Sequence, residues 1–173
     1  MQTFIRKRNR LPANVYQGPH SYFLTLCCHE RQKLFLNAAL VQALLDLLGN
    51  ACAAHSFEIC AYCFMPDHFH VLLTSHDLSA NLPSLVRAFK GVAAARARQS
   101  GIANLWQKGF YDHVIRATDS LPRVTEYILT NPVRAGLANT PTEWPFSGPP
   151  GVIGKTPISG PPYVPPWKEK VAG

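Results

Sequence analysis

The sequence FEICAYCFMPDHFHVLLTS, residues 57–75, contains two short apolar runs separated by a tripeptide typical of turns. The runs at 57–64 and 68–75 are rich in aromatic and aliphatic residues, a composition that indicates β-strands. The tripeptide Met65–Asp67 has a central proline, which favours a tight connection. The stretch is therefore expected to form a β-hairpin.

The sequence on either side of this hairpin supplies further elements. Mixed aromatic and β-branched residues predict strands, and apolar residues at helical spacing predict helices. The expected strands are 21–28 and 111–116, and the expected helices are 38–55, 81–100 and 120–131. The order is β-α-β-β-α-β with one extra helix. This order predicts an α+β protein of the ferredoxin-like plan, an antiparallel sheet with helices packed on one face.

Length and composition exclude several classes of protein. The chain has 173 residues, of which 47% are hydrophobic, and this suits one substantial core rather than a disordered or collagenous chain. The most apolar stretch, from Leu40, includes Gln42 and Asp46 and is shorter than the roughly 18 uninterrupted apolar residues of a spanning helix. The basic N-terminus lacks the apolar run of a secretory signal. Five cysteines, an odd number, fit a reducing compartment, so we expect a cytoplasmic protein.

Composition also divides the chain into three parts. The last 26 residues contain seven prolines and five glycines, which cannot propagate helix or sheet hydrogen bonds. We expect residues 148–173 to form a Pro/Gly-rich tail, residues 1–19 a basic N-terminal arm, and residues 20–147 a single folded domain.

Positive charge is concentrated in two segments. The chain has 17 Lys and Arg against 10 Asp and Glu, a formal charge of +7. Residues 78–111 contain five basic residues and no acid, and the arm contributes Arg6, Lys7, Arg8 and Arg10. Two basic segments favour a polyanionic partner, most commonly nucleic acid. The alternative is a solvated basic surface without a specific partner.

Two stretches outside the arm, 81–100 and 106–116, have a pattern that suits a phosphate-binding surface. In the helix predicted at 81–100, apolar residues share one face, and Arg87, Lys90 and Arg98 lie roughly opposite. In WQKGFYDHVIR, residues 106–116, aromatic and basic residues alternate in the manner of a single-strand binding surface. There Trp106, Phe110 and Tyr111 could stack on bases while Lys108 and Arg116 contact phosphates. The alternative is that Trp106 and Phe110 cover the edge of the core.

His68 and His70 are the first candidates for chemistry. They are two residues apart in a predicted strand, so both imidazoles point to the same face and could share one cation. The alternative is a pair of hydrogen-bonded structural histidines. A zinc site is a further reading, because Cys60 and Cys63 precede the pair. In a regular strand these two cysteines would point to opposite faces, which disfavours zinc.

Tyr127 is the second candidate. Arg123, Tyr127 and Asn131 follow at i, i+4 and i+8 along one stripe of the helix predicted at 120–131, for which Ser120 is a candidate N-cap. Asn131 precedes a proline and so is expected to end this helix. The alternative for Tyr127 is an aromatic residue at the core boundary with a hydrated hydroxyl.

Taken together, several separated motifs resemble the REP-associated tyrosine transposases, members of the single-tyrosine transposases with a His-hydrophobic-His motif. The motifs are MPDHFHVLL, RAFKG, WQKGFYDHVIR, YILTNPVRAGL and EWPFSG, in that order, and the resemblance covers about residues 6–147. It implies that His68 and His70 hold a divalent metal, usually Mg²⁺ or Mn²⁺, with Asn131 as a further ligand. It implies that Tyr127 is the nucleophile.

The reaction implied by the resemblance is cleavage of single-stranded DNA near a palindromic hairpin. The tyrosine would form a 5′-phosphotyrosine link and release a 3′-OH. A phenol ordinarily titrates near pH 10 and needs help to attack, but its phenolate is a good leaving group for resealing. Imidazole ligands alone are more typical of zinc and other transition metals, so magnesium or manganese is implied by the resemblance. The resemblance also favours a monomer associated with the nucleoid.

Two features set this chain apart. The family's usual serine pair near the end of the domain is Ser147–Gly148 here, and a long tail follows. We expect Tyr163 and Trp167 to let the tail fold back over the basic site and restrain activity. The alternative overall is a nucleic-acid-binding module that has lost its chemistry. In either case, we expect the N-terminal arm, the 81–100 helix and the 106–110 loop to line one single-strand path to Tyr127.

Overall fold

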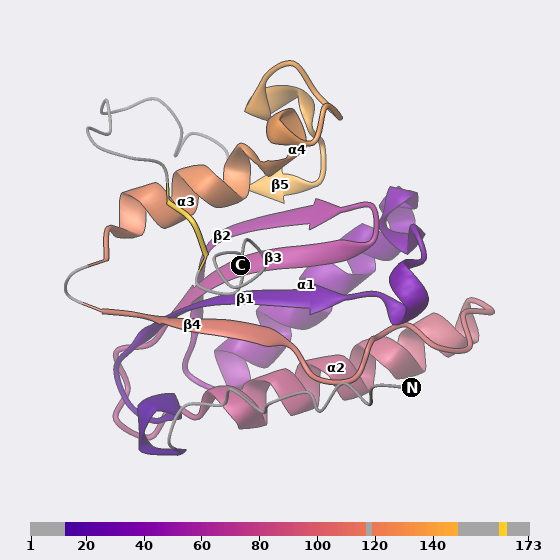
Figure 1. Ribbon diagram of the computed structural model, residues 1–173. Coiled ribbons are helices and arrows are strands. Elements are labelled where there is room, and N and C mark those ends of the chain that lie inside the picture. The colour runs from indigo at the N-terminus through magenta and orange to yellow at the C-terminus, as the bar shows by residue number, and fades with distance from the viewer. Residues whose placement is uncertain (1–12, 117–118, 149–162, 166–173) are drawn as a thin grey trace, which may run out of the picture.

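The computed structural model of the chain describes residues 13–116, 119–148 and 163–165. Figure 1 shows a central sheet with helices on both sides. The strands are β1 (Ser21–Cys27), β2 (Glu58–Met65), β3 (His68–Thr74), β4 (Tyr111–Ile115) and β5 (Ser147–Gly148). The helices are α1 (Ala38–Ala54), α2 (Leu82–Gln99), α3 (Leu121–Leu129) and α4 (Asn131–Arg134). Short 3-10 helices are η1 (Ala13–Tyr16), η2 (His29–Arg31), η3 (Leu34–Leu36) and η4 (Pro141–Glu143).

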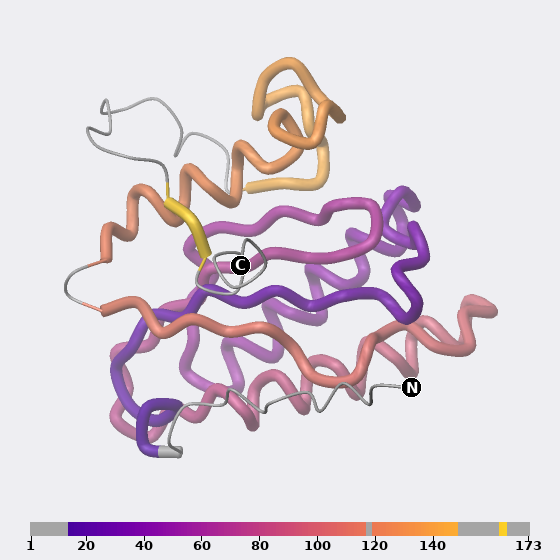
Figure 2. The backbone as a smooth tube through the Cα atoms, in the orientation of Figure 1, coloured from indigo at the N-terminus to yellow at the C-terminus, as the bar shows by residue number. Residues whose placement is uncertain are grey.

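The sheet has the order β4-β1-β3-β2-β5, and every neighbouring pair is antiparallel. In the trace of Figure 2, β1 and β3 lie side by side although they are far apart in the sequence. α1 and α2 each connect two strands that have a third strand between them. The predicted ferredoxin-like order and the predicted hairpin of β2 and β3 are confirmed.

Both core helices begin at an asparagine that caps them. Asn37 Oδ1 accepts a hydrogen bond from the backbone N–H of Leu40 at 3.0 Å, and Asn81 Oδ1 accepts one from that of Ser84 at 2.9 Å. These contacts satisfy amide groups that have no partner within the helix. α1 and α2 bury their apolar sides against one face of the sheet, where the alternate β3 residues Phe69, Val71 and Leu73 meet them.

The extra helix, α3, covers the opposite face of the sheet. Val124, Tyr127 and Ile128 pack there against Phe23 of β1 and Leu72 of β3. The sequence showed that α3 is amphipathic but did not show which face it covers. Since α1 and α2 occupy one face, the apolar side chains on the other face require a separate cover. That face also contains His68 and His70.

The folded body extends beyond both predicted boundaries in small ways. Tyr16 of η1 is only 5% exposed and donates a hydrogen bond to Asp112 at 2.6 Å, so the chain is packed before residue 20. At the other end, β5 pairs with β2, and Trp144 Nε1 donates to the carbonyl oxygen of Phe64 at 2.9 Å. Residues 1–12 of the basic arm, and most of the tail, lie outside the described residues.

Candidate active site

His68 and His70 lie on one face of β3, as the two-residue spacing predicts. Their Nε2 atoms are 3.1 Å apart and their rings are nearly perpendicular, with an interplanar angle of 83°. His70 is 3% exposed, and the side chain of His68 is 20% exposed. The two nitrogens therefore converge on one point that is accessible from the side of His68.

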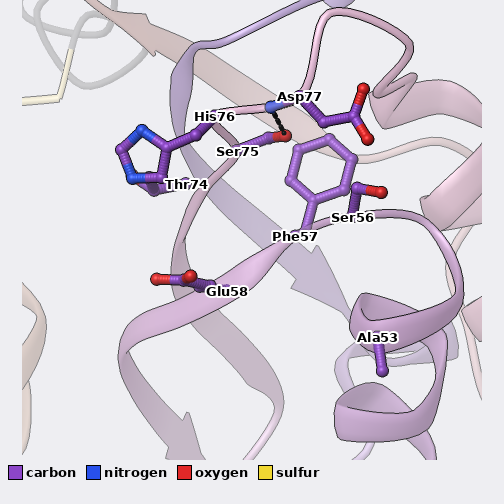
Figure 3. A pocket seen from close by; sticks show the side chains of 8 residues that line it. All are labelled: Ala53, Ser56, Phe57, Glu58, Thr74, Ser75, His76 and Asp77. Carbon is purple, nitrogen blue, oxygen red and sulfur yellow. Dashed lines mark hydrogen bonds between the residues drawn. The ribbon is translucent and has the colours of Figure 1, made fainter.

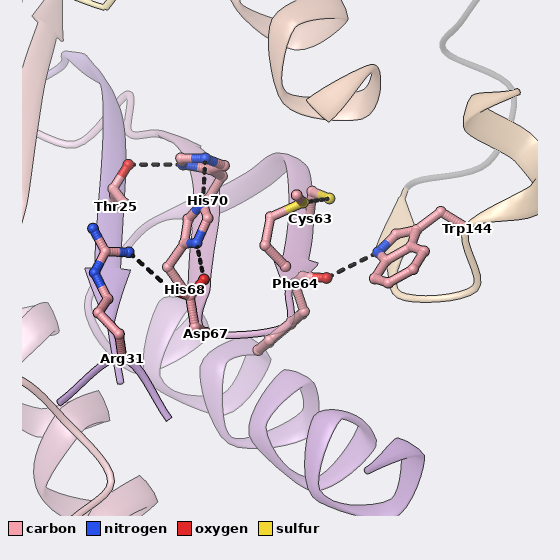
Figure 4. Close-up of polar contacts among 9 residues, drawn as sticks. Thr25, Arg31, Cys63, Phe64, Asp67, His68, His70 and Trp144 are labelled. Atoms are coloured by element: carbon pink, nitrogen blue, oxygen red, sulfur yellow. Dashed lines mark hydrogen bonds and ion pairs between the residues drawn. The ribbon is translucent and has the colours of Figure 1, made fainter. Parts of the chain in front are cut away.

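Neighbouring polar groups hold the other nitrogen of each ring (Figure 4). His68 Nδ1 is 2.6 Å from Oδ1 of Asp67, and the other oxygen of this carboxylate, Oδ2, accepts a hydrogen bond from Arg31 at 3.4 Å. His70 Nδ1 is 2.7 Å from the hydroxyl of Thr25, directly across the strand pair in the register of β1 and β3. Partners of this kind fix the orientation of an imidazole and leave its Nε2 for a cation.

This donor set fits a divalent cation. Two nitrogen ligands about 2.1 Å from one ion and roughly at right angles to each other would lie about 3 Å apart, close to the separation of the two Nε2 atoms. Asn131 is 7% exposed, and its Nδ2 has no hydrogen-bond partner among the described residues. A half-turn of that amide presents its oxygen in the same place. The side chain of Asn131 is therefore capable of a further contact.

Tyr127 is brought to the same face by α3. Its ring centroid is 6.1 Å from that of His70 and 5.8 Å from that of Phe23, both in edge-on arrangements. Only 7% of its surface is exposed, so it is not the half-hydrated boundary residue considered as an alternative. One chain therefore brings the histidine pair and the tyrosine together.

Arg134 lies over the Tyr127 ring, with Cζ 4.1 Å from the ring centroid. Its Nη2 donates to the backbone carbonyl of Tyr127 at 2.8 Å, and its Nη1 donates to the hydroxyl of Thr130. A stacked guanidinium adds a positive charge beside the phenol ring. Arg134 belongs to the motif YILTNPVRAGL, but nothing in the spacing of that motif predicts this contact.

The described part of the tail also reaches this face. The Tyr163 ring is 5.5 Å from Tyr127, 6.0 Å from Phe23 and 6.2 Å from His113 between ring centroids. In Figure 2 the segment 163–165 lies beside α3. Trp167, the other predicted docking residue, lies outside the described residues.

The prediction that Cys60 and Cys63 point to opposite faces of their strand is wrong. A bulge between Ile59 and Ala61 interrupts the alternation of β2, so Cys60 packs against the same apolar cluster that contains Cys63. Even so, no three side chains of His, Cys, Asp or Glu within the described ranges form a group that could hold a metal. Burial raises the pKa of Cys63 to about 12, with the nearby Arg134 charge opposing the shift. All five cysteines are free thiols.

The predicted phosphate contacts within the described residues do not all lie on the face of the sheet that carries Tyr127. α2, with Arg87 and Arg98 exposed, covers the face of the sheet opposite the histidine pair. Amphipathic spacing shows which side of a helix points outward, but it does not show which face of the sheet the helix covers. Arg116, which is exposed, and the partly buried Arg123 border the connection from β4 to α3. Arg6, Lys7, Arg8 and Arg10 lie outside the described residues.

Lys90 is engaged by the loop that follows α2. Its Nζ donates to the carbonyl oxygens of Gln107 at 2.9 Å and Gly109 at 2.7 Å. Burial lowers the pKa of Lys90 from 10.5 to about 8. Trp106 packs between Phe35 and Phe89, and Phe110 also packs against the core. Both aromatic side chains therefore cover the edge of the core, which was the alternative to base stacking. Lys108 alone in this loop is an exposed cation.

A pocket lies at the end of the sheet near Thr74, away from the histidine pair (Figure 3). It is lined by residues from the α1–β2 connection and the end of β3, among them Phe57, Glu58 and Thr74. Asp77, at its rim, accepts hydrogen bonds from the backbone N–H and hydroxyl of Ser79, which lower the pKa of this carboxyl. His68 is at the opposite end of β3, so this pocket is not part of the candidate site.

The fold and these residues define a transposase-type enzyme, and comparison with known proteins identifies the family. The chain belongs to the family described as "Transposase IS200 like", whose model matches residues 17–131. The chain is therefore an enzyme of the transposase class.

Individual relatives confirm the resemblance seen in the motifs. A Haemophilus influenzae protein provisionally named a REP-associated tyrosine transposase is 29% identical over 141 residues, which are 73% of this chain and 77% of that protein. The REP-associated tyrosine transposase of Escherichia coli is 33% identical over 91 residues, 53% of each chain. A solved structure of a REP-associated tyrosine transposase bound to a REP hairpin matches with a TM-score of 0.66 and 26% identity, covering 85% of this chain and 82% of that one.

The described residues form the helices α1 to α4 and the short 3-10 helices η1 to η4. None of them combines the length and apolar character that crossing a bilayer demands.

Proposed function

We propose that this transposase is a metal-dependent endonuclease and strand transferase for single-stranded DNA, acting beside palindromic hairpins through a 5′-phosphotyrosine intermediate. The observation that supports this most strongly is the placement of Tyr127 beside His70, with ring centroids 6.1 Å apart, on a face where two imidazole nitrogens converge. A nucleophile and a metal-binding pair on one face are the parts that such a reaction needs.

In the proposed reaction the hydroxyl oxygen of Tyr127 attacks a backbone phosphorus. A bond forms between the phenol oxygen and phosphorus, and the bond from phosphorus to the 3′ oxygen breaks. The phenol gives up its proton and the departing oxygen gains one, which yields the 5′-phosphotyrosine link and a free 3′-OH. Another 3′-OH can then reverse these steps, with the phenolate as leaving group.

We propose His68 and His70 as metal ligands, with Asn131 as the third. When bound, a divalent cation such as Mg²⁺ or Mn²⁺ would act as a Lewis acid toward the phosphate oxygens. Thr25 and Asp67 keep the two imidazoles oriented, since each contacts the Nδ1 atom of one ring. The two imidazoles are thus held in a fixed orientation, and Asn131 would complete the donor set.

We propose a DNA hairpin of the REP type as the nucleic-acid partner, because a similar structure is that of a transposase bound to a REP hairpin. Near Tyr127, Arg116 and Arg123 are the predicted cations best placed for the cleaved strand. On the other face, Arg87 and Arg98 would contact DNA that passes around the sheet. Lys108 and the basic arm are further proposed phosphate contacts. Phosphate contacts of this kind dominate affinity and depend on salt.

We propose that residues 148–173 act as a restraining tail. Tyr163 supports this, because its ring lies against both Tyr127 and Phe23, where a DNA strand must approach the nucleophile. Deleting residues 149–173 should raise the rate of cleavage, and Tyr163→Ala should reproduce part of that gain. An unchanged rate in both variants would remove this role.

We propose that the chain acts as a monomer in the cytoplasm, in association with the nucleoid. The support is that one chain supplies both the histidine pair and the tyrosine, so the site does not need a residue from a second copy. Light scattering with and without hairpin DNA measures the mass. A DNA-bound dimer would contradict the monomer.

The experiment is incubation of the full chain with single-stranded DNA that contains a REP-like hairpin, in Mn²⁺ or Mg²⁺. We expect a covalent protein–DNA adduct in wild type and none in Tyr127→Phe. His68→Ala and His70→Ala should lose the adduct and keep most of the DNA affinity, because the basic residues supply it. If wild type binds the hairpin without forming an adduct, the chain is a binding module that has lost its chemistry.

A further inference from the structure

Arg134 is the last residue of α4, and its side chain turns back toward α3. Its guanidinium lies on the face of the Tyr127 ring, with Cζ 4.1 Å from the centroid. Two hydrogen bonds fix this plane, one from Nη2 to the Tyr127 carbonyl at 2.8 Å and one from Nη1 to Thr130 Oγ1. A planar guanidinium can stack and donate in two directions at once, which an ammonium cannot do.

Aromatic rings approach the same tyrosine from other directions. Phe23 and His70 meet the Tyr127 ring edge-on, at interplanar angles of 68° and 66°. The Arg134 guanidinium covers a face of the Tyr127 ring, in addition to these edge-on contacts. Rotation of the phenol away from its present orientation would break the stacking contact, so Arg134 restricts the rotamer of Tyr127.

We propose that Arg134 is a positioning residue for Tyr127, which holds the phenol ring in the orientation for attack and stabilises the negative charge that its oxygen acquires. This inference rests on the proposed function of Tyr127 as the nucleophile. A cation on the face of an aromatic ring interacts more favourably as that ring becomes anionic. The same contact assists both directions of the reaction, since the phenolate is also the leaving group.

A purely structural role for Arg134 is the competing explanation. The Tyr127 carbonyl is in the last turn of α3, where carbonyl oxygens have no partner within the helix, and an arginine there stabilises the helix end. Such a role would affect unfolding but would not require a planar cation over the ring. The experiment must therefore separate stability from the rate of the covalent step.

The test uses the full chain, single-stranded DNA with a REP-like hairpin, and Mn²⁺, and it follows adduct formation in a single turnover. We expect Arg134→Gln to lower the rate at saturating DNA about two- to fivefold, as a cation–π contact at an exposed site warrants, with little change in the half-saturating DNA concentration. The rate of Arg134→Lys should lie between those of wild type and Arg134→Gln. Arg96→Gln, the same charge change at the end of α2 on the other face, is the matched control and should resemble wild type.

Chemical rescue separates positioning from folding. Arg134 is exposed, so methylguanidinium should reach the space left in Arg134→Ala and restore part of the rate, whereas methylammonium should not. A defect in folding would not respond to either. The thermal midpoint of each variant is measured in parallel.

Each outcome has a defined reading. If wild type forms no adduct, the proposed function fails and this inference falls with it. If wild type forms the adduct and Arg134→Gln matches Arg96→Gln, the positioning role alone is wrong. A change confined to the half-saturating DNA concentration, or the absence of rescue by methylguanidinium, would also overturn it.

Discussion

The contact between Thr25 and His70 offers a sharp test of the metal site. Thr25 is 5% exposed, and its hydroxyl lies 2.7 Å from His70 Nδ1. If Nε2 binds a cation, the proton is on Nδ1, and the hydroxyl oxygen of Thr25 accepts a hydrogen bond from that N–H. Thr25→Val keeps the shape of the side chain and removes the acceptor. The buried N–H then lacks a partner, which costs about 1–3 kcal/mol, or the proton moves to Nε2 and blocks the metal.

Either result weakens metal binding, and loss of an outer contact of this kind typically costs about 10–100-fold in affinity. The assay is adduct formation as a function of Mn²⁺ concentration, together with calorimetric titration of Mn²⁺ without DNA. Thr74→Val is the matched control, because Thr74 is on the same face of β3 and makes a cross-strand hydroxyl contact with Ser21 at its far end. If Thr25→Val and Thr74→Val require the same Mn²⁺ concentration as wild type, the reasoning about His70 is wrong.

Three further predictions concern residues around the site. Asp67→Asn, which removes the charge beside His68 Nδ1, should raise the Mn²⁺ requirement about tenfold, and an unchanged titration would contradict it. Burial lowers the pKa of Lys90 from 10.5 to about 8, so between pH 8 and 10.5 the unfolded chain binds one more proton than the folded chain, and stability should rise with pH. Urea unfolding of wild type and Lys90→Met across this pH range measures how each free energy of unfolding depends on pH. The same pH dependence in both proteins would contradict the prediction. A Cβ at Gly148 would lie 2.8 Å from the Tyr62 hydroxyl oxygen, so Gly148→Ala should destabilise the fold by about 1 kcal/mol, and an added Tyr62→Ala should remove most of that cost in a double-mutant cycle.

Four of the five strands of the sheet and the two core helices could be predicted because their signals are local, whereas the two-residue strand β5 carries no such signal. The 57–75 hairpin and the helices at 38–55 and 81–100 match β2–β3, α1 and α2 within two residues at each end. Alternation along β3 placed both histidines on one face. The predicted helix at 120–131 instead ends at Leu129, and α4 begins at Asn131, with Pro132 in its first turn. Ser120 occupies the N-cap position of α3 but makes no side-chain capping hydrogen bond.

Residues that depend on strand register or on the covering of faces could not be predicted. Thr25 contacts His70 only because β1 and β3 pair in a particular register, and no local pattern encodes that pairing. Arg87 and Arg98 of α2 point outward as predicted, whereas Lys90 is held by the following loop, and α2 lies on the face opposite Tyr127. Arg134 is within the quoted motif YILTNPVRAGL, but its contact with the Tyr127 ring depends on the break between α3 and α4.

The most direct test of the central claim is to locate the covalent bond. After reaction with hairpin single-stranded DNA and Mn²⁺, nuclease and trypsin digestion should leave a nucleotide on the peptide 124–134, and fragmentation should place the 5′-phosphate on Tyr127. Tyr127→Phe should give only the unmodified peptide. A phosphate link on any other residue, or a cleaved strand without a protein adduct, would contradict the account.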